Sequence, residues 1–230
     1  EKEHWWFVAK RNFLVEMLSR CGIVEGNVLD VGCGTGAVMQ FLAQRKYQVE
    51  GVDMSDTALN FCVKKGLRVS KGVAEKLPYP DDSFDVVTAL DVIEHVPDES
   101  PVINEIKRVL KPGGVCIATV PAHQFLWSYH DVQLHHYRRY RKDGFEKIFQ
   151  NKLSIEYSSW IHCFSLVPAL IVRMFVKIKK IKKNESDIKD SNIFLNKIMK
   201  IFYFFELFIF RVFKRLPFGL SIIVVARKKI

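Results

Sequence analysis

The sequence predicts an α/β protein built on a doubly wound, mainly parallel sheet. Between residues 27 and 120, short apolar segments of strand character alternate with helical segments, and the first strand runs into a glycine-rich turn. The chain has 230 residues, of which 49% are hydrophobic and 26% are charged. This composition excludes a disordered protein and is sufficient for one domain with a sizeable core.

The expected elements follow one another in a regular order. A helix over residues 1–20 leads into a turn at 22–26. Strands are expected over residues 27–31, 48–52, 67–70, 84–90, 115–120, 153–160 and 220–226. Helices are expected over residues 36–44, 55–65 and 101–110. Ser55 is placed to cap the helix after it, Pro101 suits a first helical turn, and Gly113 and Gly114 end the last helix.

The glycine-rich turn is the strongest chemical signal. Residues 30–36 read Asp-Val-Gly-Cys-Gly-Thr-Gly, and Asp53 ends the next strand 17 residues after Gly36. Glycines let a ligand approach the backbone closely, and a carboxylate at the same sheet edge can accept hydrogen bonds from two ribose hydroxyls. The spacing differs from the dinucleotide fingerprint, and the turn has no lysine to hold phosphates. A turn of this kind alone is equally consistent with a structural connection.

Four segments in the right order give a family resemblance: residues 29–36, 51–55, 74–85 and 109–114. Over residues 28–122 the chain resembles the S-adenosylmethionine-binding core of class I methyltransferases, in the type 11-like branch related to ubiquinone and menaquinone biosynthesis. The resemblance implies S-adenosyl-L-methionine as the cofactor. It also implies a Rossmann-like, seven-stranded sheet whose last strand is antiparallel and follows a helical insertion.

The same resemblance implies which residues contact the cofactor. Asp30, Gly32 and Gly34 would face its methionine part, Asp53 its ribose and Met54 its adenine. The full expected set is Asp30, Gly32, Cys33, Gly34, Asp53, Met54, Ala74, Glu75 and Leu90. Cys33 is expected to be a small packing residue rather than a reactive thiol. Val73 stands where the family commonly has an acidic residue, so Glu75 or main-chain groups would bind the adenine amino group.

A candidate catalytic group follows the fourth core strand. Asp91, Glu94 and His95 have helical i, i+3, i+4 spacing at the edge that carries the glycine turn. His95 is the first candidate for a general base, because its ordinary pKa is near neutral. A purely structural role for Glu94 and His95 is an equal alternative. A related motif in ubiquinone O-methyltransferases is associated with a divalent metal; that hypothesis ranks below both, and no metal ligand is assigned.

Two aromatic and basic segments flank the core and are candidates for the acceptor side. They resemble segments that cover the cofactor and line the acceptor site in some of these methyltransferases. The candidate acceptor-binding residues are Trp5, His135, His136, Arg138 and Tyr140. In the first helix Trp6, Phe13 and Met17 share one side, and Lys10 and Arg11 are polar positions. The alternative role for this helix is simple packing on the sheet. For residues 130–141 the alternative is a solvated surface loop.

The excess positive charge is concentrated in one segment. The formal net charge is +10, and residues 165–215 contribute +8 of it through twelve Lys or Arg and four Asp or Glu. On a helical projection Asn196, Lys197, Lys200, Arg211, Lys214 and Arg215 form one stripe, whereas Ile198, Phe202, Phe205, Ile209 and Phe213 lie elsewhere. This pattern is typical of a helix that binds an anionic membrane surface. Packing on the sheet or on another subunit is an equally good explanation. Nucleic acid ranks well behind, and no apolar run reaches the length of a membrane span.

These observations predict a single methyltransferase domain over residues 1–230. Its parts are a helical cap (1–22), the cofactor-binding core (23–122), an acceptor-side segment (123–164), a basic helical insertion (165–216) and the last strand (217–230). The expected activity is methyl transfer to an oxygen or carbon nucleophile of a small or lipid-linked acceptor. The alternative is a non-catalytic module that tethers a membrane or partner. Five scattered cysteines and no visible signal peptide favour the cytoplasm, with peripheral attachment to the inner face of the membrane. Oligomeric state is not predicted.

Overall fold

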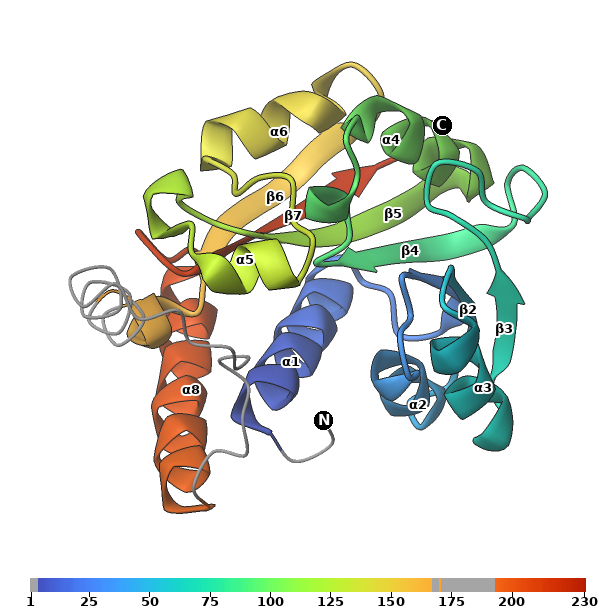
Figure 1. Ribbon diagram of the computed structural model, residues 1–230. Helices are drawn as coiled ribbons and strands as arrows, with labels where there is room; N and C mark the ends of the chain where they lie inside the picture. The colour runs from blue at the N-terminus through green and yellow to red at the C-terminus, as the bar shows by residue number, and fades with distance from the viewer. Residues whose placement is uncertain (1–3, 167–169, 171–192) are drawn as a thin grey trace.

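A computed structural model describes residues 4–166, 170 and 193–230 of the chain. Seven strands form one sheet in the order β3-β2-β1-β4-β5-β7-β6 (Figure 1). The strands are β1 (Gly26–Val31), β2 (Tyr47–Asp53), β3 (Arg68–Lys71), β4 (Phe84–Leu90), β5 (Leu110–Pro121), β6 (Ser154–Ile161) and β7 (Ser221–Arg227). Neighbours from β3 to β5 are parallel, and β7 is antiparallel to both β5 and β6. The predicted fold class, including the antiparallel last strand, is confirmed.

Helices cover both faces of the sheet, as Figure 1 shows. Helices α4 (Glu99–Val109) and α6 (Lys142–Gln150) pack on one face through Ile103, Ile106, Phe145 and Phe149, which are fully buried. Helices α1 (Trp5–Arg20), α2 (Ala37–Ala43), α3 (Asp56–Lys64) and α8 (Ile193–Phe213) lie on the other. Both layers of the α/β fold are therefore filled by apolar side chains.

The structure adds elements that the sequence reading left unassigned. These are η1 (Ile93–His95), η2 (Gln124–Leu126), α5 (Tyr129–Gln133) and α6. The signal for α6 was present, because Phe145, Ile148 and Phe149 have i, i+3, i+4 spacing. Strand β5 also begins at Leu110 rather than 115, since Leu110 pairs with Phe84 across a register shift.

Helix α8 corrects the predicted helical stripes. Its buried side is Tyr203, Glu206, Leu207 and Phe210, spaced three and four residues apart. Three of the five residues expected on the apolar side, Phe202, Phe205 and Phe213, are instead 48%, 55% and 71% exposed. The helix has more apolar residues than its buried stripe can hold, so aromatic side chains remain on its outer face. The predicted insertion residues 167–169 and 171–192 lie outside the described residues. No helix in the described ranges is long and apolar enough to span a membrane.

Helices α1 and α8 are joined along their length although they are far apart in the sequence. The Trp5 amide donates to Asn196 Oδ1 (2.8 Å), and Tyr203 Oη donates to the Ala9 carbonyl (2.9 Å). Phe13 packs edge-to-face on Phe210, with ring centroids 4.8 Å apart. The part of the predicted insertion that is described therefore supports the N-terminal helix.

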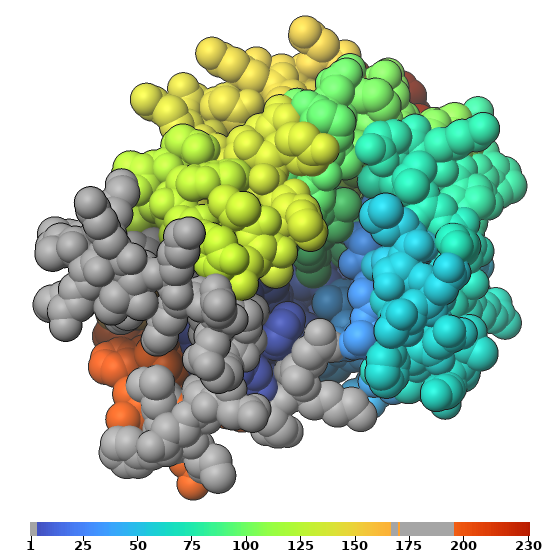
Figure 2. Space-filling view, in the orientation of Figure 1, coloured from blue at the N-terminus to red at the C-terminus, as the bar shows by residue number. Residues whose placement is uncertain are grey.

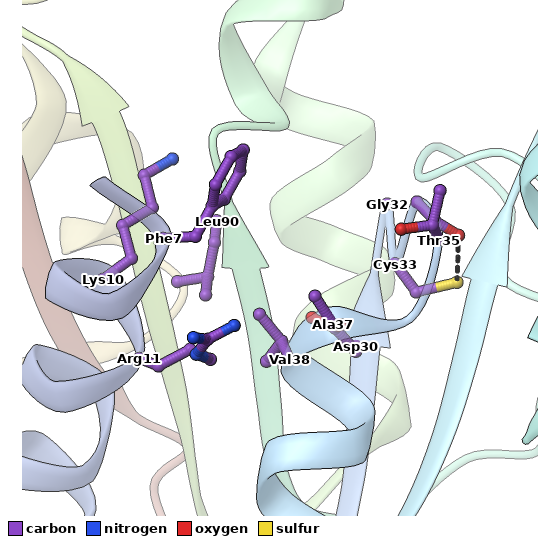
Figure 3. A pocket seen from close by; sticks show the side chains of 11 residues that line it. Phe7, Lys10, Arg11, Asp30, Gly32, Cys33, Thr35, Ala37, Val38 and Leu90 are labelled. Carbon is purple, nitrogen blue, oxygen red and sulfur yellow. Dashed lines mark hydrogen bonds between the residues drawn. The ribbon is translucent and has the colours of Figure 1, made fainter. Parts of the chain in front are cut away.

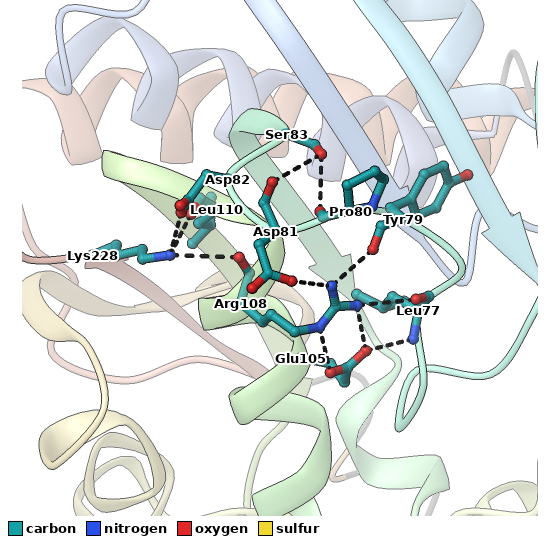
Figure 4. Close-up of polar contacts among 10 residues, drawn as sticks. All are labelled: Leu77, Tyr79, Pro80, Asp81, Asp82, Ser83, Glu105, Arg108, Leu110 and Lys228. Atoms are coloured by element: carbon teal, nitrogen blue, oxygen red, sulfur yellow. Dashed lines mark hydrogen bonds and ion pairs between the residues drawn. The ribbon is translucent and has the colours of Figure 1, made fainter.

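Arg108 on α4 fastens the loop between β3 and β4 (Figure 4). Its guanidinium donates to the carbonyls of Leu77 (3.0 Å) and Tyr79 (2.8 Å) and to the carboxylates of Asp81 and Glu105 (both 2.7 Å). These bonds satisfy main-chain groups of a loop that follows the turn at residues 73–76. The loop is thus held against α4.

Candidate cofactor and acceptor site

The glycine turn connects β1 to α2 at the carboxyl edge of the sheet. Gly32 and Gly36 have φ angles of 66° and 78°, which other residues rarely adopt. A Cβ atom on Gly32 would lie 2.6 Å from a methyl of Val92, and one on Gly36 would lie 2.3 Å from Leu67. At Gly34 (φ 53°) a Cβ would meet nothing within 4 Å. The outer glycines are therefore required by packing, and the space beside the Gly34 Cα is open to a ligand.

Asp53 ends β2 and is bound to the same turn. Its Oδ2 accepts from the Gly34 amide (2.9 Å), and its Oδ1 accepts from the Ser55 amide (2.9 Å). Each carboxylate oxygen keeps a second lone pair for a ligand hydroxyl. The two predicted features, the turn and the acid, are thus in direct contact.

A cavity of ≈170 Å³ lies between the turn and α1 (Figure 3). Of the residues predicted to contact the cofactor, Asp30, Gly32, Cys33, Gly34 and Leu90 line it. The other lining residues are Phe7, Lys10, Arg11, Thr35, Ala37 and Val38. In Figure 2 the surface is hollowed between the segment around α5 and the region of α2 and α3, with α1 at its floor. The sheet edge therefore supplies one wall, and α1 supplies another.

Three cavity residues from α1 were not predicted as site residues. Lys10 and Arg11 read as polar helix positions, but Lys10 lines the cavity and Arg11 is 8% exposed. The aromatic ring that α1 presents to the cavity is Phe7. Trp6 stacks on His162, with centroids 4.2 Å apart, and Trp5 lies beside α8. The sequence carried no signal for this choice, because α8 determines the rotation of α1.

Asp30 is buried beneath the turn, at 3% exposure. Its Oδ1 accepts a hydrogen bond from Thr88 Oγ1 on β4 (2.7 Å). Burial raises the pKa of Asp30 from its ordinary 3.8 to about 7, against the opposing effect of the Thr88 hydroxyl. Cys33 is also buried, and burial raises the pKa of its thiol, which supports the predicted packing role.

The residues expected around an adenine ring are placed at the same edge. Met54 directly follows Asp53 and is 71% exposed. Ala74 and Glu75 are half-buried in the turn closed by a bridge between Val73 and Lys76. Val73 is 43% exposed, so the apolar side chain at the family's acidic position faces solvent. An open apolar face and a nearby turn remain available to a planar ligand.

Asp91 begins the candidate catalytic segment with a φ of 58°. Its Oδ2 forms an ion pair with Lys10 from α1, and its Oδ1 accepts from Thr119 Oγ1 (2.8 Å). Burial would raise the pKa of Asp91, but the Lys10 ammonium and the Thr119 hydroxyl hold it below its ordinary value. The metal arrangement that the family resemblance implies would use Asp91 with Glu94 and His95. Asp91 is instead held by Lys10 and Thr119, and the polar atoms that come together belong to Glu94, His95 and His136. The implied set with Asp91 is therefore not assembled, and we derive no step through a cation.

Glu94 is fully buried, and within the described part of the chain neither of its carboxylate oxygens has a hydrogen-bond partner. Burial, followed by the nearby charge of Asp91, raises the pKa of Glu94 well above its ordinary value. His136 Nε2 lies 4.0 Å from Glu94 Oε1, and the His95 ring packs edge-on against His136 at 4.6 Å. Polar atoms of Glu94, His95 and His136 lie within 4.8 Å of one another. The tertiary structure therefore joins the motif after β4 to the segment after β5.

His136 is held from behind by a buried acid. Its Nδ1 lies 3.1 Å from Asp131 Oδ1, which also accepts from Arg139 Nε at 2.7 Å. Burial would raise the pKa of Asp131, but its bonds to His136 and Arg139 lower it far below the ordinary range. The sequence reading missed Asp131 and Arg139 because their partners are fixed only by the fold.

Two predicted acceptor residues are engaged inside the protein. Arg138 Nη1 donates to Glu99 Oε1 (2.7 Å), and Tyr140 Oη donates to the same oxygen (2.9 Å). Tyr140 is 6% exposed. These side chains fasten the segment to α4, so the structure favours a positioning role for them. His135 is exposed and has a φ of 57°. Of the five predicted acceptor residues, only His136 lies in the cluster with Glu94 and His95.

Comparison with known proteins defines the class. Residues 29–118 match the model of a family described as a methyltransferase domain. These residues run from β1 into β5 and include the glycine turn, Asp53 and the Glu94 segment. Over these residues the chain is similar to that family, in agreement with the four motifs.

The particular relatives are ubiquinone biosynthesis O-methyltransferases. The chain is 40% identical to the enzyme of that name from Pseudomonas fluorescens over 105 residues, which cover 41% of this chain and 44% of the relative. It is 38% identical to the one from Pseudomonas paraeruginosa over 112 residues, covering 44% and 47%. The chain thus spans about half the length of the curated relatives it matches.

Solved structures share the fold over nearly the whole chain. A phosphoethanolamine N-methyltransferase from Haemonchus contortus, solved in complex with S-adenosyl-L-methionine, has a TM-score of 0.63 at 20% identity and covers 95% of this chain and 53% of its own. An S-adenosylmethionine-dependent methyltransferase from Methanosarcina mazei has a TM-score of 0.61 at 16% identity, covering 93% and 97%. At these identities the likeness concerns the fold.

Proposed function

We propose that the protein is an S-adenosylmethionine-dependent methyltransferase that acts on a small or lipid-linked acceptor. The main support is the hydrogen bond from the Gly34 amide to Asp53, because Gly34 lines the cavity and Asp53 is thereby held beside it. A sulfonium cofactor has ribose hydroxyls and a methionine group but no phosphate. A carboxylate for the ribose and open backbone for the methionine part therefore match it.

The roles of the individual residues follow from their positions. Asp53 would bind the ribose hydroxyls, and Met54 with Ala74 and Glu75 would flank the adenine. The Gly32–Gly34 backbone and Asp30 would face the methionine part. Lys10 and Arg11, which line the same cavity, are placed to neutralise its carboxylate. When bound, the cofactor supplies an electrophilic methyl group on a good leaving group, so positioning in a dry site accounts for much of the acceleration.

Titration calorimetry with S-adenosylhomocysteine tests the cofactor assignment. Replacing Asp53 by Ala removes two charge-assisted hydrogen bonds and should weaken binding about 100-fold. Asp53→Asn, which keeps the shape of the side chain, separates loss of charge from collapse of the turn. Asp56→Ala is the matched control, because the Asp56 side chain is exposed and forms a surface ion pair with Lys71. Absent binding by the unaltered protein, or equal binding by Asp53→Ala, would contradict the proposal.

A turnover assay distinguishes an enzyme from a non-catalytic binding module. Transfer of a labelled methyl group to quinol, polyprenyl or glycan-lipid acceptors would establish an enzyme. Tight cofactor binding with no transfer to any of them would instead favour a module that tethers a membrane or partner. The names of the curated relatives support the first outcome.

We also propose peripheral attachment to an anionic membrane through the outer face of α8. That face carries an exposed apolar set: Ile201, Phe202, Phe204, Phe205, Phe208, Val212 and Phe213. Exposed basic residues at Lys197, Arg211, Lys214 and Arg215 accompany it. Aromatic surface combined with cations matches the interface of an anionic bilayer, which attracts each Lys or Arg by about 1 kcal/mol.

Flotation with vesicles tests the attachment. Vesicles that contain phosphatidylglycerol, an anionic lipid, should carry the protein upward, and neutral phosphatidylcholine vesicles should carry less. Substituting Phe204, Phe205 and Phe208 by Ser should abolish flotation while leaving the fold intact, because all three are outside the core. Deleting α8 is a poor test, since Tyr203 and Phe210 pack on α1. Failure of the unaltered protein to float would refute the attachment.

A further inference from the structure

The two carboxyl oxygens of Glu94 are buried and are not paired with any described residue. Glu94 is fully buried, yet neither carboxylate oxygen has a partner among residues 4–166, 170 and 193–230. Leaving a buried polar group without a hydrogen bond costs about 1–3 kcal/mol. A buried group of this kind calls for an explanation, such as a catalytic role or a bound water, ion or ligand atom. Glu94 is therefore the starting point for assigning the acceptor side of the site.

His136 faces Glu94 with a defined nitrogen. Asp131 is ionised and can only accept hydrogen bonds, so His136 Nδ1 must donate to it. In the neutral ring, Nε2 then carries the free lone pair and lies 4.0 Å from Glu94 Oε1. Asp131 thereby fixes both the tautomer and the orientation of His136. Arg139 in turn fixes Asp131, with a bond of 2.7 Å.

The 4.0 Å separation is informative. It is too long for a direct hydrogen bond, but one oxygen atom can lie about 2.8 Å from both His136 Nε2 and Glu94 Oε1. A hydroxyl suits this position because it donates one hydrogen bond and accepts another. A carbon nucleophile can make neither bond. The segment that carries Glu94 starts directly after Leu90, which lines the cofactor cavity.

We infer that the acceptor is a hydroxyl compound whose oxygen binds between His136 and Glu94, and that His136, oriented by Asp131, is the base. This inference rests on the proposed methyltransferase function. The acceptor O–H proton passes to His136 Nε2, the oxygen forms a bond to the cofactor methyl, and the methyl–sulfur bond breaks with its electron pair on sulfur. The products are a methyl ether, S-adenosylhomocysteine and a proton on His136. Glu94 holds the acceptor oxygen.

His95 has a different place in this arrangement. It is exposed, and burial, followed by the charge of His136, lowers its pKa. The residues with charges that affect it include Asp91 and His135 as well. In the part of the chain that the structure describes, no hydrogen bond from a buried acid orients His95 in the way that Asp131 orients His136. We therefore assign the base to His136, whose ring packs against that of His95, and not to His95 as the sequence predicted.

Paired substitutions test the assignment. The assay follows labelled methyl transfer to a panel of phenols, catechols and primary alcohols. His136→Gln should lower kcat by about 100-fold or more with little change in KM, because general bases contribute 10²–10⁴-fold. His95→Gln should lower kcat less than about tenfold. His136→Gly should regain activity with added imidazole. Affinity for S-adenosylhomocysteine should stay unchanged in all three variants.

A second measurement needs no turnover. In nitrogen-15 spectra of the histidine-labelled protein, His136 should show a protonated Nδ1 and an unprotonated Nε2, and Asp131→Asn should disturb that state. Phenol or catechol added to the S-adenosylhomocysteine complex should shift the Nε2 signal.

Several results would overturn the inference while leaving the proposed function intact. They are full kcat in His136→Gln, equal losses in both histidine variants, transfer only to carbon or nitrogen acceptors, and no Nε2 shift with any hydroxyl compound. A stoichiometric bound metal that is lost in His136→Gln would overturn it as well. Failure to bind S-adenosylhomocysteine would instead refute the proposed function.

Discussion

The glycine turn and helix α1 enclose the same cavity but are positioned in different ways. The turn lies at the end of β1, and its partner Asp53 comes only 19 residues after Gly34. Helix α1 is held by α8, through contacts such as the one between Trp5 and Asn196, which are 191 residues apart. One wall is therefore set by a local motif on neighbouring strands, and the other by long-range packing. Mutations should separate the two.

The largest expected effect is at the packing between α1 and α8. Phe210 is fully buried and contacts Phe13, so Phe210→Ala should lower the free energy of unfolding by about 3–5 kcal/mol. Phe208→Ala is the matched control, because Phe208 is 62% exposed and its loss should cost at most about 0.5 kcal/mol. Urea unfolding measures both. Equal costs would mean that α8 does not pack on α1 through this face.

At the wall formed by the glycine turn, we expect the free energy of unfolding to depend on pH. Burial raises the folded-state pKa of Asp30 from 3.8 to about 7, so the fold favours the protonated acid. The cost of ionising Asp30 is absent below its unfolded pKa, grows as the pH rises and is complete above the folded pKa. Asp30→Asn removes this cost, and its stability advantage over the unaltered protein should grow by about 2–3 kcal/mol from pH 5 to pH 8. Unfolding curves of both proteins at the two pH values measure this. A constant difference would show that Asp30 does not titrate in this range.

The ion pair between Lys10 and Asp91 joins the two walls. Lys10→Met leaves Asp91, with 25% of its side chain exposed, without its cation and removes a charge from the cavity. Affinity for S-adenosylhomocysteine should fall about tenfold, which is a loss of about 1.4 kcal/mol. Lys71→Met, which breaks an exposed pair with Asp56, is the control and should bind normally. Calorimetry distinguishes them, and unchanged affinity in Lys10→Met would mean that α1 does not contribute to the cofactor site.

The smallest effect is expected at the rim of the helix pair. Arg211 Nε lies 2.8 Å from Glu16 Oε2, and the Arg211 side chain is 59% exposed. Arg211→Ala should therefore lower the free energy of unfolding by about 0.2–1 kcal/mol. The difference should shrink in high salt, because exposed ion pairs are screened. A larger, salt-independent loss would indicate that Arg211 supports packing rather than charge.

Strand periodicity in the sequence was sufficient to predict the mainly parallel sheet, and the rule that parallel strands place their carboxyl ends at one edge brought the glycine turn and Asp53 to the same place. The antiparallel last strand came from the family resemblance. Only the tertiary structure decided which side of α1 faces the cavity, that α8 buries Tyr203 and Phe210 while exposing its other aromatics, and that His136 meets Glu94. Each of these depends on contacts between residues distant in the chain, and local spacing carries no information about them.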